Sequence, residues 1–331
     1  MSRLLQCTAA LVCPALATSA APLPKDRKPV IGPETVNRLK PVGELERDIY
    51  RIVWGPKAGE VALLSFSQPA EVIDDLTLKP IRRLGAGRPL IHLAVAADRQ
   101  TTAWIENGTR VEIHGSKADK PLVIETGMSQ PDAAFSPDGR LLATGGAGIQ
   151  AKLWELPSGK FLRALDAGGE GGLTVVFSPD GKTLAIGNRN DVPRLYEVAT
   201  GKLLHTLLDK SMTQGLKFSP DGKQLAVGYV DGTVGLWDVN TGKLARSAPA
   251  KVEEVYEVDW TPKGDLLVTA GRQGKIVLWD PKELKALREL DSPEWVIQAR
   301  FSPDGTRLWT AGGGIAPGTE RKIVVWGLAD R

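Results

Sequence analysis

Short apolar runs alternate with turn residues along most of this chain, and this pattern predicts β-strands. Residues 173–208 show it clearly, with apolar or alternating runs at 173–177, 183–187, 193–198 and 202–207. Ser-Pro-Asp-Gly at 178–181 and Thr-Gly at 200–201 separate these runs. Proline fixes φ and glycine supplies a positive φ, so both segments are typical of tight turns. No window keeps a helical period between such closely spaced turns, so the pattern argues against helices.

This four-run unit recurs with large apolar residues at two fixed positions. An anchor residue precedes each turn, and successive anchors are about 41 residues apart. The seven anchors are Trp54, Val95, Phe135, Phe177, Phe218, Trp260 and Phe301. A second aromatic column follows the last five anchors at Trp154, Tyr196, Trp237, Trp279 and Trp326. Two columns in phase indicate a structural repeat.

Four short strands in each repeat are the unit of a β-propeller blade. We therefore expect an all-β fold over residues 35–331, a seven-bladed β-propeller of four-stranded blades. The last repeat lacks a fourth strand, and residues 35–42 lie at the right distance before Trp54 to supply it. We expect this N-terminal strand to complete the last blade and close the ring, which removes edges that invite aggregation.

The first 21 residues have the layout of a secretory signal peptide, with Arg3, an apolar stretch and a run of small residues. Residues 22–34 are rich in proline and charge and indicate a linker. Cys7 and Cys13 both lie inside the leader, so its removal leaves no thiol for a disulfide, a metal site or a nucleophile. We expect an exported protein, periplasmic or extracellular, without a membrane span after cleavage. A disordered start and an uncleaved anchor are the alternatives.

Composition excludes two classes of protein. The chain has 331 residues, of which 42% are hydrophobic and 24% charged, as in folded globular proteins and unlike disordered ones. The formal net charge of +3 is close to neutral for this length, so we expect no nucleic-acid partner.

Three kinds of motif recur with the repeat: the Phe-Ser-Pro-Asp-Gly turn, the strand ends Trp237-Asp238 and Trp279-Asp280, and Thr-Gly-Lys at 200–202 and 241–243. They resemble the WD-repeat β-propeller family, in a bacterial-type, exported form. The resemblance covers residues 35–331, and it implies a rigid interaction platform without catalysis. The family's Gly-His pair and its His–Asp–Ser/Thr–Trp hydrogen-bond set are missing. We therefore expect stability to depend on packing and on hydrogen bonds within the sheets.

The sequence offers few residues for catalysis or metal binding. Its three histidines, His92, His114 and His205, fall in different repeats and different columns, so they predict no zinc site. Neither a nucleophile elbow nor a phosphate-binding loop is found. We expect no enzyme activity, no cofactor and no metal.

One polar column lies three residues before the anchors, on the predicted innermost strand. Its members are candidates for the mouth of a central channel, namely Arg51, His92, Asp132, Glu257 and Gln298. A hydrated channel lining is one interpretation, and the site of a lactonase-, lyase- or quinoprotein-like propeller enzyme is the alternative. Directly before three anchors, Lys217, Asp259 and Arg300 replace small residues and predict charge contacts between blades.

A partner surface is the second candidate site. Met212 and Trp295 stand in predicted connections between blades, where other repeats have small or polar residues. Trp309 replaces the Ala or Val of other repeats, and an insertion at 312–321 follows it. A tryptophan on a loop is a typical interface anchor, while packing under the loop is the other interpretation.

We expect a non-catalytic scaffold that binds a protein or peptide outside the cytoplasm through Met212, Trp295 and Trp309. A propeller enzyme at the channel mouth and a purely structural role in the envelope are the alternatives.

Overall fold

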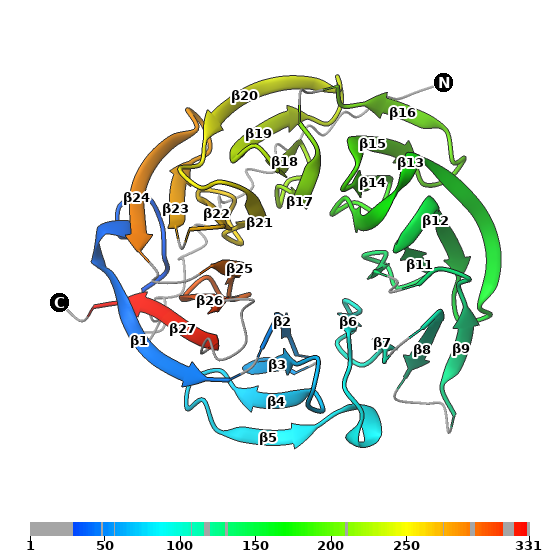
Figure 1. The fold of residues 1–331 in the computed structure, drawn as a ribbon, viewed down its shortest axis with the longest axis horizontal. Coiled ribbons are helices and arrows are strands. Elements are labelled where there is room, and N and C mark those ends of the chain that lie inside the picture. The colour runs from blue at the N-terminus through cyan, green and yellow to red at the C-terminus, as the bar shows by residue number, and fades with distance from the viewer. Residues whose placement is uncertain are drawn as a thin grey trace, which may run out of the picture.

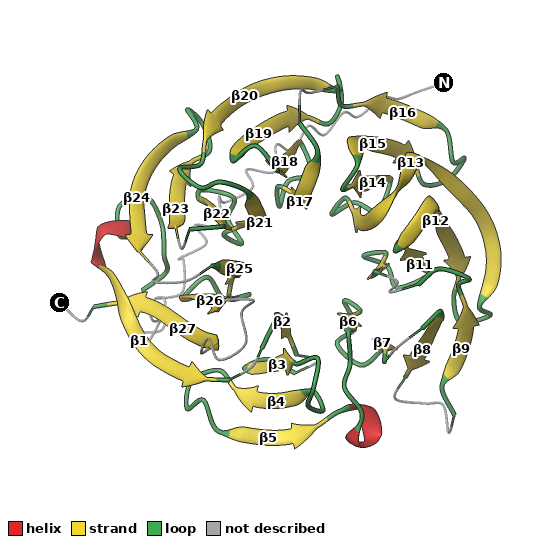
Figure 2. Ribbon diagram, viewed as in Figure 1, coloured by secondary structure: helices red, strands yellow, loops and turns green. Residues whose placement is uncertain are grey.

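The computed structural model describes residues 29–329 except 48, 56, 107, 116–119, 130–131, 209–210, 274, 292–294 and 314–320. The sheets in this part of the chain stand around a common centre as an all-β propeller (Figure 1). Its helical structure is limited to the short 3-10 helices η1 (Val36–Arg38) and η2 (Gly85–Gly87), as Figure 2 shows. The expected leader 1–21 and residues 22–28 of the expected linker lie outside the described residues.

Five sheets have four strands each, paired antiparallel. The first two consist of β2 (Arg51–Trp54), β3 (Glu60–Leu64), β4 (Glu71–Asp74) and β5 (Pro80–Arg83), and of β6 (His92–Val95), β7 (Thr102–Ile105), β8 (Arg110–His114) and β9 (Leu122–Glu125). Two more consist of β17 (Thr213–Phe218), β18 (Gln224–Tyr229), β19 (Thr233–Asp238) and β20 (Lys243–Pro249), and of β21 (Val255–Trp260), β22 (Leu267–Gly271), β23 (Lys275–Asp280) and β24 (Lys285–Asp291). The fifth consists of β25 (Val296–Phe301), β26 (Arg307–Gly313), β27 (Arg321–Leu328) and β1 (Leu39–Glu46).

The sixth sheet has seven strands and corrects the expected fold. It consists of β10 (Ala133–Phe135), β11 (Leu141–Thr144), β12 (Ala147–Glu155), β13 (Lys160–Phe177), β14 (Thr183–Asn188), β15 (Asp191–Glu197) and β16 (Leu203–Thr206). The expectation of a closed ring of seven separate four-stranded blades is therefore wrong, because the described strands form five four-stranded sheets and one of seven strands.

The physical reason for this difference lies in β13, which is 18 residues long. Its first part pairs with β12 and its last part with β14, where a break between two blades was expected. The glycine-rich stretch 168–172 contains no proline that would end the strand. Gly171 and Gly172 instead continue the pairing, opposite Gly148 and Ala147.

The N-terminal strand β1 lies at the outer edge of the last sheet, where it pairs antiparallel with β27. It covers residues 39–46 and not the expected 35–42, since 36–38 form η1. Arg288 of β24 holds this junction, because its guanidinium donates to the carbonyl oxygens of Val36 and Leu39 at 2.7 Å each.

The Ser-Pro-Asp-Gly turns repeat one set of hydrogen bonds. In the turn at 219–222, the Ser219 hydroxyl donates to Asp221 at 2.7 Å and accepts the Gln224 N–H at 3.0 Å. The bond from Ser219 contributes most to holding the pKa of Asp221 below its ordinary value. Gly222 has a φ of +72°, and a Cβ there would lie 3.4 Å from the ring of Pro179 in the preceding turn. Each turn therefore packs closely on its neighbour.

Apolar side chains of adjacent sheets meet in separate clusters between the sheets. One cluster joins Val268 and Leu278 of one sheet to Phe301 and Leu308 of the next. Another joins Leu195 to residues of the β17–β20 sheet. Packing between sheets therefore buries apolar side chains, and such burial is the main driving force for folding.

Buried Trp–Thr hydrogen bonds add to this packing, so the expectation that stability depends only on packing and sheet hydrogen bonds is incomplete. The indole N–H groups of Trp154, Trp279 and Trp326 donate to Thr144, Thr269 and Thr310 at 2.9, 3.0 and 3.0 Å. Each bond lies between the second and third strands of its sheet and satisfies a buried donor.

Thr269→Val tests one of these bonds, because valine keeps the shape of threonine and removes the acceptor. We expect the free energy of unfolding, measured by urea denaturation, to fall by about 1–3 kcal/mol, the cost of a buried unsatisfied donor. The same substitution in a Trp279→Phe background should cost clearly less, because phenylalanine has no N–H to satisfy. An equal cost in both backgrounds would show that the hydrogen bond contributes nothing.

Candidate functional site

The channel candidates lie on the innermost strands, which Figure 1 shows nearest the centre of the molecule as β2, β6, β17, β21 and β25. Arg51 and His92 begin β2 and β6, and Asp132 comes directly before β10. Glu257 and Gln298 lie in β21 and β25. The structure brings these five residues into two groups, each spanning more than one sheet.

The first group consists of Arg51, His92 and Asp132. Nε2 of His92 lies 2.5 Å from Oδ1 of Asp132, and Nη1 of Arg51 lies 3.5 Å from the same oxygen. The second oxygen of Asp132 accepts the N–H of Val175 in β13 at 3.2 Å. Both oxygens of this carboxylate are therefore engaged.

Burial and neighbouring charge set the protonation of this group. Burial of Asp132 would raise its pKa, but His92, Arg51 and the Val175 N–H outweigh burial and hold the pKa well below its ordinary value. Burial, reinforced by the charge of Arg51, lowers the pKa of His92. The imidazole is therefore neutral near pH 7 and donates from Nε2. Its Nδ1 has no hydrogen-bond partner among the described residues, and a neutral ring of this tautomer carries no proton there.

The second group consists of Glu257, Gln298 and Arg300. Oε2 of Glu257 lies 3.2 Å from Nη2 of Arg300 and accepts from the Gln298 amide at 3.3 Å. The Gln298 carbonyl oxygen accepts the N–H of Ile52 in β2. Burial raises the pKa of Glu257, and the charge of Arg300 offsets only part of that effect.

The predicted charge contacts between sheets are confirmed. Besides the Arg300–Glu257 pair, Nζ of Lys217 in β17 lies 3.6 Å from Oδ1 of Asp259 in β21. The other oxygen of Asp259 accepts the N–H of Phe301 in β25 at 2.8 Å. Asp259 therefore joins three consecutive sheets.

Two of these contacts follow one rule: a polar side chain of one sheet accepts an N–H from the innermost strand of the next, as Asp259 does from Phe301 and Gln298 from Ile52. Asp132 makes the corresponding contact with Val175 in the last part of β13, within the seven-stranded sheet. An innermost strand has a free edge, and its buried N–H groups need acceptors outside their own sheet. This arrangement can fix sheets to one another. Within the described residues, no three His, Cys, Asp or Glu side chains are placed to hold a metal ion.

The partner-surface candidates are described by the face of the molecule on which they lie. The molecule has two faces that we name by the ends of the innermost strands. The loop face is the side where these strands begin. The turn face is the side where they end and the Ser-Pro-Asp-Gly turns follow. Met212 precedes β17 on the loop face and is 45% exposed. Trp295 precedes β25 on the same face and is half-buried. The Arg272 guanidinium carbon lies 4.7 Å from the centre of its indole ring.

Trp309 is not on the surface, so its expected role as a partner contact is wrong. It is 0% exposed and lies in β26 within the cluster that joins the last sheet to the β2–β5 sheet. Its ring meets that of Trp54 edge-on at 6.0 Å between centres. Other repeats have a small residue at this position, and here the indole fills the space between the two sheets. Residues 314–320 of the neighbouring insertion lie outside the described residues.

Sequence reasoning missed Phe66, which is 60% exposed on the loop face after β3. Its ring stacks on that of Tyr50, with 3.8 Å between centres and 11° between planes. Tyr50 donates to the carbonyl oxygen of Leu90 at 3.0 Å, and burial raises the pKa of its hydroxyl to about 12. The sequence did contain a signal for this exposed ring, because Phe66 is an aromatic residue inside the turn segment 65–69.

Comparisons with known proteins match parts of the chain. The family model described as "WD domain, G-beta repeat" matches residues 129–155 and 243–280. The model of the anaphase-promoting complex subunit 4 WD40 domain matches residues 208–261. We also note that no helix in the described residues has the length and apolar character needed to cross a membrane.

Three similar curated proteins are guanine nucleotide-binding protein beta subunits from plants. The one from Arabidopsis thaliana is 28% identical over 68 residues, 20% of this chain and 18% of the relative. Those from Nicotiana tabacum and Solanum tuberosum are 30% identical over 60 residues, 18% of this chain and 16% of each relative. The chain thus covers less than a fifth of the length of these relatives. With the sheets around a common centre and the recurring turns, these matches support a WD-repeat β-propeller.

Proposed function

We propose that this chain is a non-catalytic interaction scaffold that binds a protein or peptide partner through its loop face. The WD-repeat propeller fold supports an interaction platform. The observation that carries the proposal is a set of apolar side chains on the loop face of nearby sheets, the exposed Phe66 and Met212 and the half-buried Trp295. Aromatic residues and methionine are enriched in protein interfaces relative to the rest of the surface.

Phe66 is the strongest anchor in this set because its ring is exposed and held in place. Tyr50 supports one side of the ring, and the Tyr50 hydroxyl is fixed by its bond to Leu90. A partner that covers the other side of Phe66 gains apolar burial and orders few side chains, so little entropy is lost on binding.

Trp295 is held on the neighbouring sheet by charged residues. Arg272 lies over its ring, and the same guanidinium contacts Glu253 at 3.1 Å and Glu254 at 3.2 Å. An aromatic centre surrounded by charged groups has the composition of an interface core and rim. Met212 lies before β17, two sheets away from the sheet that contains β25. Its flexible side chain can adapt to a partner.

The paired substitution Phe66→Ser with Trp295→Ala tests this surface. Affinity-tagged protein is cross-linked in extracts of its native source, and recovered proteins are quantified by mass spectrometry. We expect the main partner to fall at least about tenfold, since truncating an interface anchor costs about 2 kcal/mol or more. Ile81→Ser is the matched control, because Ile81 is 48% exposed on the outer strand β5. Equal recovery with both variants would contradict the proposal.

We also propose that the protein acts outside the cytoplasm. The support is the leader pattern of residues 1–21, with Arg3 before an apolar stretch and a run of small residues after it. Expression of the full chain in a bacterial host, followed by fractionation and N-terminal sequencing, tests this. We expect an exported chain cleaved near residue 21, whereas a cytoplasmic chain that retains its leader would contradict the proposal.

A further inference from the structure

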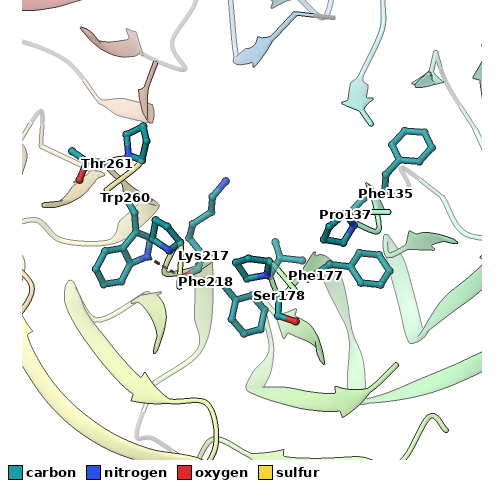
Figure 3. A pocket seen from close by; sticks show the side chains of 13 residues that line it. Phe135, Pro137, Phe177, Ser178, Lys217, Phe218, Trp260 and Thr261 are labelled. Atoms are coloured by element: carbon teal, nitrogen blue, oxygen red, sulfur yellow. Dashed lines mark hydrogen bonds between the residues drawn. The ribbon is translucent and has the colours of Figure 1, made fainter. Parts of the chain in front are cut away.

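A cavity on the turn face is not used by the proposed scaffold function. Its volume is about 360 Å³, a size found among ligand pockets. It lies where four innermost strands end and four turns begin, and Figure 3 shows its side chains. Two kinds of residue recur around it, the aromatic anchors Phe135, Phe177, Phe218 and Trp260 and the turn prolines Pro137, Pro179, Pro220 and Pro262.

The cavity has one charged group among the described residues that line it, the ammonium of Lys217. Figure 3 shows this side chain between Trp260 and Phe177. The other polar side chains of the lining are already engaged, since Ser178 donates to Asp180 and Thr261 donates to Asp265, each at 2.6 Å. Lys217 is therefore the polar group available to a ligand.

Lys217 keeps bonding capacity although it contacts Asp259. An ammonium has three N–H donors, and the carboxylate of Asp259 lies 3.6 Å from Nζ. The second oxygen of Asp259 is taken by the Phe301 N–H. The Lys217 side chain is 39% exposed, so its remaining donors are accessible from the cavity.

We propose that this cavity binds an extended peptide segment of a partner protein, in which an acidic residue stands among proline and large apolar residues. The acidic side chain pairs with Lys217, and its neighbours lie against the aromatic and proline side chains. This site is on the opposite face from the proposed partner surface and does not depend on it.

The repetition of the lining favours an extended peptide over a compact ligand. Each of the four turns presents an exposed proline beside an aromatic anchor, which is half-buried at Phe135 and Phe177 and buried at Phe218 and Trp260. A compact ligand would use one such position, whereas an extended chain can place successive side chains on several. Grooves lined by aromatic residues bind proline-rich segments in this way, because such segments are already extended before binding.

The charge of the lining favours an acidic peptide over a neutral or basic one. A carboxylate beside Lys217 makes a charge-assisted hydrogen bond in a largely apolar setting, where such bonds are strong. A basic peptide residue at the same place would be repelled by the ammonium of Lys217. It would also find no free carboxylate at Asp259, since both oxygens of Asp259 are engaged.

A peptide array tests the proposal directly. The probes are immobilised nonapeptides with a central Glu, Gln or Lys, flanked by Pro, Leu and Phe in all orders, and binding of the labelled full chain is measured. We expect the best Glu peptides to bind about tenfold more tightly than their Gln counterparts, and the Lys peptides not to bind. Lys217→Gln should remove the preference for Glu over Gln.

Lys223→Gln is the control, because Lys223 lies in the turn that follows β17, outside the cavity lining, and is 80% exposed. It should keep the preference for Glu, and both variants should unfold at nearly the wild-type temperature.

Three results would overturn the proposal: no peptide binding, equal binding of Glu and Gln peptides, or an unchanged preference in Lys217→Gln. Lys217-dependent binding of laurate or anilinonaphthalene sulfonate without peptide binding would also overturn it, in favour of a small-molecule site. Loss of partner recovery through Phe66 and Trp295 would leave these measurements unaffected.

Discussion

The free edge of each innermost strand is the constraint on which the rest of this structure depends. Such a strand pairs with one neighbour, so part of its N–H groups face the next sheet. A buried N–H without an acceptor costs about 1–3 kcal/mol. In this protein Gln298 and Asp259 supply acceptors to Ile52 and Phe301 across the gap between sheets, and Asp132 supplies one to Val175 within the seven-stranded sheet. Apolar clusters bring the sheets together, and these directional bonds set their relative positions.

The same constraint bears on where function can lie. The carboxylates of Asp132 and Asp259 have both oxygens engaged, and Glu257 is bound by Arg300 and Gln298. The centre of the molecule is thus built mainly from side chains that hold neighbouring strands. The groups on which the two proposed binding surfaces depend lie on the two faces, as the aromatic rings of Phe66 and Trp295 on the loop face and as an apolar cavity with one ammonium on the turn face.

Much of the fold was predictable from the sequence, because turn chemistry and strand spacing are local. The runs at 183–187 and 193–198 correspond to β14 and β15, and the charge contacts of Lys217, Asp259 and Arg300 followed from their columns. The separate seven-bladed ring was wrong because β13 continues through glycines that were interpreted as a break. Whether such a stretch ends a strand depends on its pairing partners, which the local sequence does not specify.

The candidate sites were less predictable because exposure depends on three-dimensional packing. Trp309 and Trp295 both depart from the composition of their columns, yet one fills a gap between sheets and the other reaches the loop face. Phe66 lies in a repeat whose motifs are degraded, so the comparison of equivalent positions between repeats did not single it out. The Trp–Thr bonds did leave a signal, since Thr144, Thr269 and Thr310 each stand nine residues after an anchor.

Amide hydrogen exchange at Phe301 tests most directly whether side chains of one sheet hold the free edge of the next. In the native protein we expect the Phe301 N–H to be as well protected as the N–H groups paired between β25 and β26, although its acceptor belongs to another sheet. Asp259→Ala should speed its exchange by about tenfold or more, while the amides paired between β25 and β26 stay protected. A Phe301 amide that exchanges freely in the native protein, or that Asp259→Ala leaves unchanged, would contradict this account.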